Sequence, residues 1–378
     1  MPISKINLTS GITGVLPSGN ATYSIERKNA KPIIINGDMA IAQRGTSATG
    51  KTSSGYYTCD RIQFVANDAG TYTVIQETST SGNAYINGFA EAYRIDCTTA
   101  DASVAADSAL FIKYKVEGRD AQVFKKGTSN AEKFTLAFWV KSNKTGTGQV
   151  NLRDEVNTRQ CSATYTISSA NTWEHKICNF AADTTGALPS TNAEGFGIEW
   201  YLAAGSNFTS GTAPTAWEAI SNADSAASLN LAISGSTDND FSLTGVQLEV
   251  GEFTSSTLPP FQFESFEDSL SRCQRYLEFS SDYGADYTSG VNSCVIMDMG
   301  GSHPIYVPMS YNVYKRAAPT MTFYNGNSGA TGTWRTNAST DVSISGTSIS
   351  SQGFSTNSAD LGGDGRSSNG TWKAESEL

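Results

Sequence analysis

The chain has 378 residues, a formal net charge of −10 and only 16% charged residues. Lysine and arginine form no cluster, and this acidic balance argues against binding to the phosphate backbone of nucleic acid. No apolar run approaches the roughly 20 residues of a membrane span, which predicts no membrane insertion. The first residues lack the basic and apolar regions of a secretory signal, so we expect cytoplasmic synthesis without a signal peptide.

Residues 1–30 contain few large apolar side chains and are interrupted by glycine and proline. Such a stretch cannot form a core of its own. We predict either a flexible arm or a segment for attachment or trimerisation that orders only against another subunit or a larger assembly. Its apolar residues Ile3, Ile6, Leu8 and Ile12 are the predicted attachment residues.

From residue 31 onward, apolar and polar residues alternate with the period of half-buried strands. This pattern is found in 109–118, 133–142, 195–203 and 229–233. In 133–142, Phe134, Leu136, Phe138 and Val140 face one way and Trp139 faces the other. Strands of this length, with no helices between them, predict an all-β fold: an antiparallel, jelly-roll-like β-sandwich over 31–258.

In 241–250 the alternation changes phase, from Phe241 and Leu243 to Val246 and Leu248. The change falls at Thr244-Gly245, where one extra residue in a bulge would restore the register. We therefore predict a single long strand with a β-bulge at its centre.

Pro259-Pro260 is a stiff break that predicts a seam between two domains. A short helix should follow, because Phe266, Leu270, Cys273 and Leu277 share one helical face. Ser265, three residues before Asp268, is typical of a capping box at its start. Further alternating stretches run to the C-terminus, so 261–378 is predicted to be a helix plus a smaller β domain.

Six cysteines lie far apart without a C-x-x-C pair, which argues against zinc. Cys161 and Cys178 could face each other across a hairpin, but buried free thiols are favoured in a chain without an export signal. The carboxylates of Asp238 and Asp240 could bind a structural calcium ion. The surrounding residues fail the EF-hand pattern, and a plain turn is the alternative.

Catalytic chemistry has little support, and no cofactor is predicted. His175 and His303 are the two histidines, and no nucleophile signature accompanies either. A glycosidase-like pair among the many carboxylates stays open, because no spacing specifies one. We expect that the protein is not an enzyme.

Aromatic side chains are the remaining candidates for ligand binding. Trp217, Tyr287, Tyr324 and Trp334 lie near Gly-, Ser- and Asn-rich turns, where a ligand could reach them. Their flat rings would stack on the C–H faces of sugars. The alternative for each ring alone is that it seals the edge of a core.

Several motifs occur in an order that resembles the carbohydrate-binding-module-like tail-fibre proteins of bacteriophages. They are 36–47 (NGDMAIAQRGTS), 57–61 (YTCDR), 138–142 (FWVKS), 172–174 (TWE), 202–208 (LAAGSNF), 243–251 (LTGVQLEVG), 260–261 (PF), 272–276 (RCQRY) and 316–320 (RAAPT). The segment 1–14 resembles fibre N-termini of phages that infect marine bacteria. Ile62 departs from the pattern, because a large aromatic residue often follows Asp-Arg in that family.

The resemblance implies a virion-associated homotrimer with its N-terminal arm bound to another tail or capsid protein. Its C-terminal domain would then be distal and receptor-facing, and its partner would be host surface polysaccharide. The family offers no defined catalytic residues to transfer. The leading hypothesis is a receptor-binding tail fibre or spike on the virion that binds glycans without cleaving them. A purely structural fibre or decoration protein is the second hypothesis, and a polysaccharide-degrading enzyme is the third.

Overall fold

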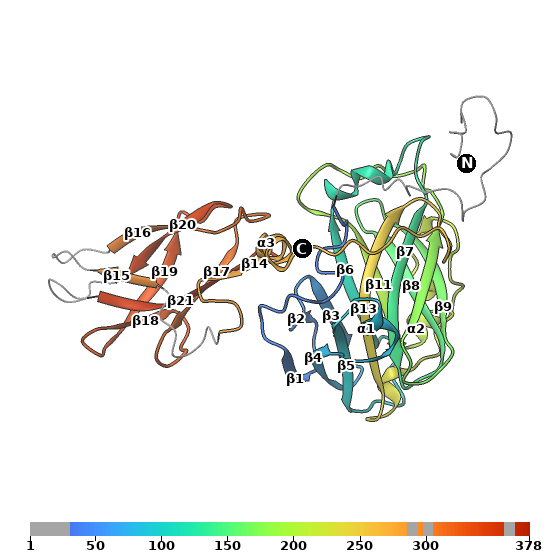
Figure 1. Ribbon diagram of the computed structural model, residues 1–378, viewed down its shortest axis with the longest axis horizontal. Helices are drawn as coiled ribbons and strands as arrows, with labels where there is room; N and C mark the ends of the chain where they lie inside the picture. The colour runs from blue at the N-terminus through green and yellow to red at the C-terminus, as the bar shows by residue number, and fades with distance from the viewer. Residues whose placement is uncertain (1–30, 286–293, 298–304, 359–366) are drawn as a thin grey trace, which may run out of the picture.

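The computed structural model describes residues 31–285, 294–297, 305–358 and 367–378. The predicted attachment residues Ile3, Ile6, Leu8 and Ile12 lie outside these ranges, as do Tyr287 and His303. Figure 1 shows two β domains of unequal size, with the helix α3 and the C-terminus between them.

The larger domain is a sandwich of two antiparallel sheets. The six-stranded sheet has the order β1 (Ser47–Lys51), β4 (Thr71–Thr78), β5 (Glu91–Thr99), β13 (Asp240–Val250), β7 (Phe134–Ser142) and β10 (Glu174–Phe180). The seven-stranded sheet has the order β12 (Glu218–Ala219), β9 (Arg159–Ile167), β8 (Gly146–Asp154), β11 (Glu194–Ala204), β6 (Ala109–Glu117), β3 (Ile62–Asn67) and β2 (Gly55–Tyr56). The predicted all-β, antiparallel sandwich is confirmed.

The core of this domain lies between the two sheets. Every second residue of β7 and of β11 is buried there, as the sequence alternation predicted. These residues are Phe134, Leu136, Phe138 and Val140 on β7 and Phe196, Ile198, Trp200 and Leu202 on β11.

Short helical turns connect the strands. They are α1 (Gly82–Ile86), α2 (Ser206–Thr209) and the 3₁₀ turns η1 (Asp120–Phe124), η2 (Asn222–Asp224) and η3 (Ile233–Gly235). The prediction of a strand over 229–233 is wrong. Ala232 is left-handed, with φ 48°, and this conformation turns the chain so that Leu231 and Ile233 both reach the core. Within the described residues, no helix has the length and apolar character that a membrane crossing needs.

The predicted bulge in β13 is confirmed. The pairing of β13 with β7 shifts register between Thr244 and Gln247, and Gly245 has a φ of 59°. The bulge keeps both apolar stretches of the strand directed to the core.

The predicted helix is present as α3 (Phe266–Gln274), capped by Ser265, whose hydroxyl accepts a hydrogen bond from the Asp268 amide. It is shorter than predicted, because Leu277 belongs to the next strand, β14 (Leu277–Phe279). Cys273 of the helix lies in a small apolar cluster with Ile35 and Ile41 of the larger domain.

The smaller domain is also antiparallel β. Its strands are β14, β15 (Cys294–Met297), β16 (Ile305–Ser310), β17 (Thr320–Asn325), β18 (Thr333–Thr336), β19 (Asp341–Thr347), β20 (Gly353–Ser358) and β21 (Ser367–Glu375). Strand β21 is central and pairs with β14, β15, β17 and β18. The core of this domain contains Phe323, Trp334, Phe354 and Trp372.

The double proline does not lie where the chain crosses between the domains. The Pro259 carbonyl accepts a hydrogen bond from Gln247 Nε2 at 2.8 Å, and Phe261 contacts the Phe89 ring at 4.9 Å between centroids. The segment 252–265 therefore lies on the larger domain, and the chain crosses at α3 and β14 (Figure 1).

Buried charges join the two domains. The guanidinium of Arg61, from the larger domain, is 1% exposed and forms an ion pair with Glu377 near the C-terminus. It also lies 3.5 Å from the centroid of the Tyr276 ring. Arg44 pairs with Glu375 at 2.7 Å and with Glu377 at 3.3 Å. These five residues are named the domain seam below.

We expect Arg61→Met to destabilise the protein, because Glu377 would lose its closest cation while staying buried. Removing one partner of a buried ion pair costs about 3 kcal/mol or more. Urea denaturation followed by tryptophan fluorescence would show the loss. Arg94→Met is the matched control, since Arg94 pairs with Asp96 while partly exposed, and such pairs contribute about 1 kcal/mol or less. Equal midpoints for the two variants would contradict a stabilising seam.

Asp60, beside Arg44, should make stability fall as pH rises. Burial raises the pKa of Asp60 from 3.8 to about 7, despite Arg44 and the hydrogen bonds from Gln43. The folded state then binds more protons than the unfolded state between about pH 4 and pH 7. This contribution to stability is complete below about pH 4 and is lost through pH 7. The unfolding midpoint of the wild type should therefore fall between about pH 4 and pH 7 relative to that of Asp60→Asn, which cannot titrate, and the two should approach each other at low pH. A constant difference between the two midpoints across this range would contradict the raised pKa of Asp60.

Candidate functional site

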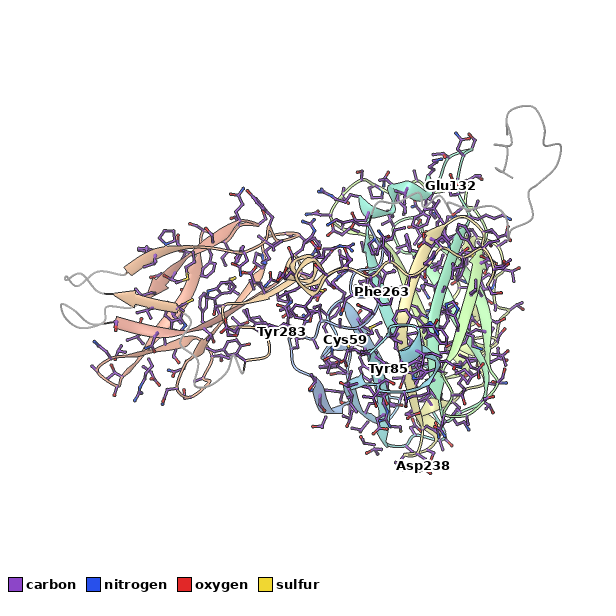
Figure 2. All side chains as sticks on the ribbon, in the orientation of Figure 1. Cys59, Tyr85, Glu132, Asp238, Phe263 and Tyr283 are labelled. Atoms are coloured by element: carbon purple, nitrogen blue, oxygen red, sulfur yellow. The ribbon has the colours of Figure 1, made fainter. Side chains whose placement is uncertain are left out.

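A groove of about 320 Å³ lies on the outer face of the six-stranded sheet. Its floor includes Trp139 of β7, His175 of β10, and Gly245 and Gln247 of β13. One wall is the turn at 87–89 after α1, and the other is the segment 255–263. Phe263, labelled in Figure 2 on the same domain as Tyr85 of α1, belongs to the second wall.

The sheet itself places the floor residues. Trp139 points outward because its neighbours Phe138 and Val140 point into the core. The β7–β10 pairing sets Trp139 directly opposite His175. Their rings are stacked, with centroids 4.9 Å apart and planes inclined by 21°. The two side chains therefore form a stacked pair across adjacent strands, in which each ring covers one face of the other.

Three phenylalanines from the two walls contact one another beside the Trp139–His175 pair. Phe89 and Phe261 meet edge to face at 4.9 Å, and Phe261 contacts Phe263 at 4.7 Å. Phe263 is 49% exposed, so its ring is available at the rim. Mutual ring contacts fix the wall, because such pairs contribute energy beyond burial alone.

The polar groups of the groove are neutral. Gln247 Nε2 donates to the Pro259 carbonyl at 2.8 Å, which joins the floor to the wall. Burial, together with the nearby Lys176 ammonium, lowers the pKa of His175, so its imidazole is neutral at pH 7. The residues that line the groove include no carboxylate, ammonium or guanidinium group.

This arrangement suits an uncharged ligand with one apolar face and several hydroxyl groups. The stacked Trp139–His175 pair offers a flat ring face on its outer side, and a neutral imidazole both donates and accepts hydrogen bonds. Concave sites with aromatic walls and a few polar groups are typical of small-molecule binding. We identify this aromatic groove as the candidate functional site.

Gly245 makes the aromatic groove possible. A Cβ atom there would lie 2.8 Å from Trp139 Cδ1 and 2.9 Å from Phe89 Cζ. Its φ of 59° is also a conformation that other residues adopt with strain. The bulge therefore brings floor and wall together at a glycine.

We expect Gly245→Ala to lower the free energy of unfolding by about 1–3 kcal/mol, since both crowding and backbone strain oppose it. Urea denaturation measures this loss, and near-ultraviolet circular dichroism reports the displaced Trp139. Gly235→Ala is the control, because a Cβ there meets nothing within 4 Å. A similarly small effect in both variants would contradict the role of Gly245.

Of the aromatic residues predicted from sequence, the three that the structure describes do not meet at one site. Trp334 is fully buried in the smaller domain, and its Nε1 donates to the Thr371 carbonyl at 3.3 Å. Tyr324 is 9% exposed on β17. Trp217 is half-buried at the edge of the larger core, where Nε1 donates to Ala181 O at 2.7 Å. Trp334 as placed offers no surface to a ligand.

Sequence reasoning missed the aromatic groove, although one signal was present. The alternation in 133–142 already directed Trp139 away from the core. The pairing of β7 with β10, and the return of 255–263 over the sheet, had no signal in the sequence.

The calcium prediction has no support in the geometry. Asp240 forms an ion pair with Arg94 at 3.0 Å and accepts a hydrogen bond from the Asn143 amide at 3.1 Å. Asp238 is exposed in the preceding turn. A cation would be repelled by the Arg94 guanidinium. Across the described ranges, no three His, Cys, Asp or Glu residues gather as a metal site.

All six cysteines are free thiols. Cys161 lies on β9 of the seven-stranded sheet and Cys178 on β10 of the six-stranded sheet, so the two do not share a hairpin. Burial raises the pKa of Cys161 to about 11 and that of Cys178 to about 12. Both thiols are therefore protonated and unreactive at neutral pH.

Comparison with known proteins gives remote likenesses in structure. No known family model and no curated protein matches the chain. A putative sugar-binding protein from Bacteroides thetaiotaomicron is 12% identical, with a TM-score of 0.30, and the match covers 58% of this chain and 100% of that one. The enzymatically active domain of bacteriophage CBA120 tailspike protein 4 is 10% identical, with a TM-score of 0.30.

The match to the tailspike covers 58% of this chain but only 21% of that protein. A family 29 carbohydrate-binding module, whose mutant was solved with mannohexaose, is 10% identical with a TM-score of 0.26. That match covers 57% of this chain and 99% of the module.

Proposed function

We propose that this protein is a carbohydrate-binding component of a bacteriophage tail fibre or spike, which adheres to host surface glycans. The aromatic groove carries the proposal. Its aromatic rings match the apolar C–H face of a sugar, and its neutral polar groups match the hydroxyl groups. The C–H face of a sugar ring would stack on an open ring face of the Trp139–His175 pair, and its hydroxyls would meet Gln247 and the imidazole. The motif order described above supports the phage context.

Binding without cleavage is the second part of the proposal. Most glycosidases need two carboxylic groups on either side of the scissile bond. The lining of the aromatic groove contains no acidic residue. Glu249 is the carboxylate nearest along β13, and it is 4% exposed and accepts a hydrogen bond from Gln247 at 3.1 Å.

Attachment to the virion as a homotrimer completes the proposal. It rests on the sequence of 1–30, which has too few apolar residues for a core and resembles fibre N-termini. Three copies would multiply weak sugar contacts by raising the effective concentration of the second and third sites. The binding partners are then a tail or capsid protein at the arm and a host polysaccharide at the aromatic groove.

A purely structural fibre is the alternative that one observation favours. The domain seam buries the Arg61 guanidinium and holds both domains in one arrangement, which also suits a load-bearing part. This alternative predicts that changes in the aromatic groove leave adsorption to host cells unaffected.

We expect Trp139→Ala to weaken binding to host surface polysaccharide about tenfold or more, because the floor loses its flat ring. Titration of the purified full chain with that polysaccharide, together with a glycan array, would measure the change. His175→Ala should weaken binding less, since Trp139 remains.

Tyr314→Ala is the matched control, because Tyr314 is an aromatic residue 64% exposed on the smaller domain. It should bind as wild type does. Wild-type binding by Trp139→Ala, with its fold intact by circular dichroism, would refute the aromatic groove as the sugar site. Release of reducing ends from the polysaccharide would refute binding without cleavage.

A further inference from the structure

A second and larger cavity, of about 600 Å³, lies where the larger domain meets α3, the helix that leads into the smaller domain. The larger domain contributes the start of its chain at 31–35 and the region of η1, including Arg119 and Asp120. The helix α3 and the residues directly after it contribute Arg272, Arg275 and Tyr276. This volume is typical of small-molecule sites, which often occur where domains meet. We call it the interdomain cavity.

The charge of this cavity is opposite to that of the whole chain. Its lining contains four basic residues and two acidic ones, and Arg272 is also paired with Glu264, so the formal balance of these groups is +1, whereas the chain carries −10. The basic residues are Lys31, Arg119, Arg272 and Arg275, and the acidic residues are Glu117 and Asp120. A local excess of cations in an acidic protein favours an anionic ligand.

One of the two acidic groups is already satisfied within the protein. Glu117 accepts hydrogen bonds from Arg275 at 2.8 and 2.9 Å and from the Tyr276 hydroxyl at 2.5 Å. Burial alone would raise the pKa of Glu117, but these hydrogen bonds outweigh burial and lower it. Glu117 therefore stays ionised and fixes the orientation of the Arg275 guanidinium.

Arg119 is the cation that a ligand could use. Its backbone is fixed, because its amide donates to the Thr191 carbonyl at 2.9 Å. Its side chain is exposed and makes no hydrogen bond or ion pair with any other described residue. Guanidinium groups bind carboxylates with two parallel hydrogen bonds, so Arg119 suits a planar anion.

The cavity also has apolar walls. Ile33, Val123 and the Tyr276 ring line it beside the cations. A surface that is apolar on one side and cationic on the other matches a sugar ring that bears a carboxylate. Residues 1–30 are a poor occupant by charge, since Lys5, Arg27 and Lys28 outnumber Glu26.

We propose that the interdomain cavity binds an anionic saccharide unit, with its carboxylate on Arg119 and its ring against Ile33 and Val123. This site is separate from the neutral aromatic groove, so the chain would bind two chemically different parts of a glycan. The larger domain and the α3 region both contribute to it, so a bound ligand would stabilise the packing of α3 on the larger domain.

The test is calorimetric titration of the full chain with an oligogalacturonate, a neutral galactose oligomer of the same length, and inorganic phosphate. We expect the oligogalacturonate to bind, and to bind more weakly at high salt, whereas the neutral oligomer should not bind at this cavity. Arg119→Ala should weaken oligogalacturonate binding about tenfold, because it removes a charged hydrogen-bonding group. Asp120→Asn should strengthen it, because an opposing charge is lost.

Two further variants separate this proposal from the previous one. Lys133→Ala removes an equal charge from an exposed pair with Glu252 and should leave binding unchanged. Trp139→Ala should also leave it unchanged. Absence of oligogalacturonate binding, or binding that depends on Trp139 and not on Arg119, would overturn the proposal. Phosphate that binds as tightly as the oligogalacturonate and competes with it would overturn the saccharide assignment, because the cavity would then hold any small anion.

Discussion

The buried guanidinium of Arg61 constrains the arrangement of the whole molecule. A charge removed from water needs its partners at short range, and Arg61 obtains them from both domains: the ring of Tyr114, the ring of Tyr276 and the carboxylate of Glu377. A rotation of one domain against the other would separate this charge from the Glu377 carboxylate and leave it only its partners in the larger domain. The interdomain cavity depends on this fixed arrangement, since one of its walls belongs to α3.

The two proposed sites differ in chemistry because they are built from different kinds of structure. The aromatic groove lies on a sheet face, where the strand pleat sets Trp139 beside His175 and a glycine bulge admits Phe89. The interdomain cavity lies where loops and a helix end meet. Contacts between domains are more polar than a domain core, so charged side chains are common there. We therefore expect the outward face of the sheet to bind flat, neutral ligand surfaces and the interdomain cavity to bind charged groups.

The sequence predicted those features that depend on local pattern and missed those that depend on distant contacts. Alternation placed β7 and β11, and the phase change placed the bulge at Gly245. The same pattern gave a wrong prediction at 229–233. A turn through a left-handed residue there directs alternate apolar side chains to the core, as a strand would. Lys126 has no signal of burial in the sequence, yet it is 4% exposed and paired with Asp154, at the end of β8, and with Asp183. Trp334 lies beside a Gly- and Asn-rich stretch that predicted an accessible ring, yet the fold buries it completely.

Rigidity and weak binding belong together in the proposed function. A neutral groove binds sugars by stacking and shared hydroxyl contacts, and each such contact is modest because water competes for the same hydrogen bonds. Adhesion then requires several sites to act at once, which succeeds only where the geometry permits simultaneous contact. Domains that moved freely would lose part of the gain as ordering entropy on each binding event. The domain seam fixes the domains before the ligand binds, so this ordering entropy is not lost on binding. This gives a physical reason for a buried ion network in a chain whose aromatic groove carries no charge.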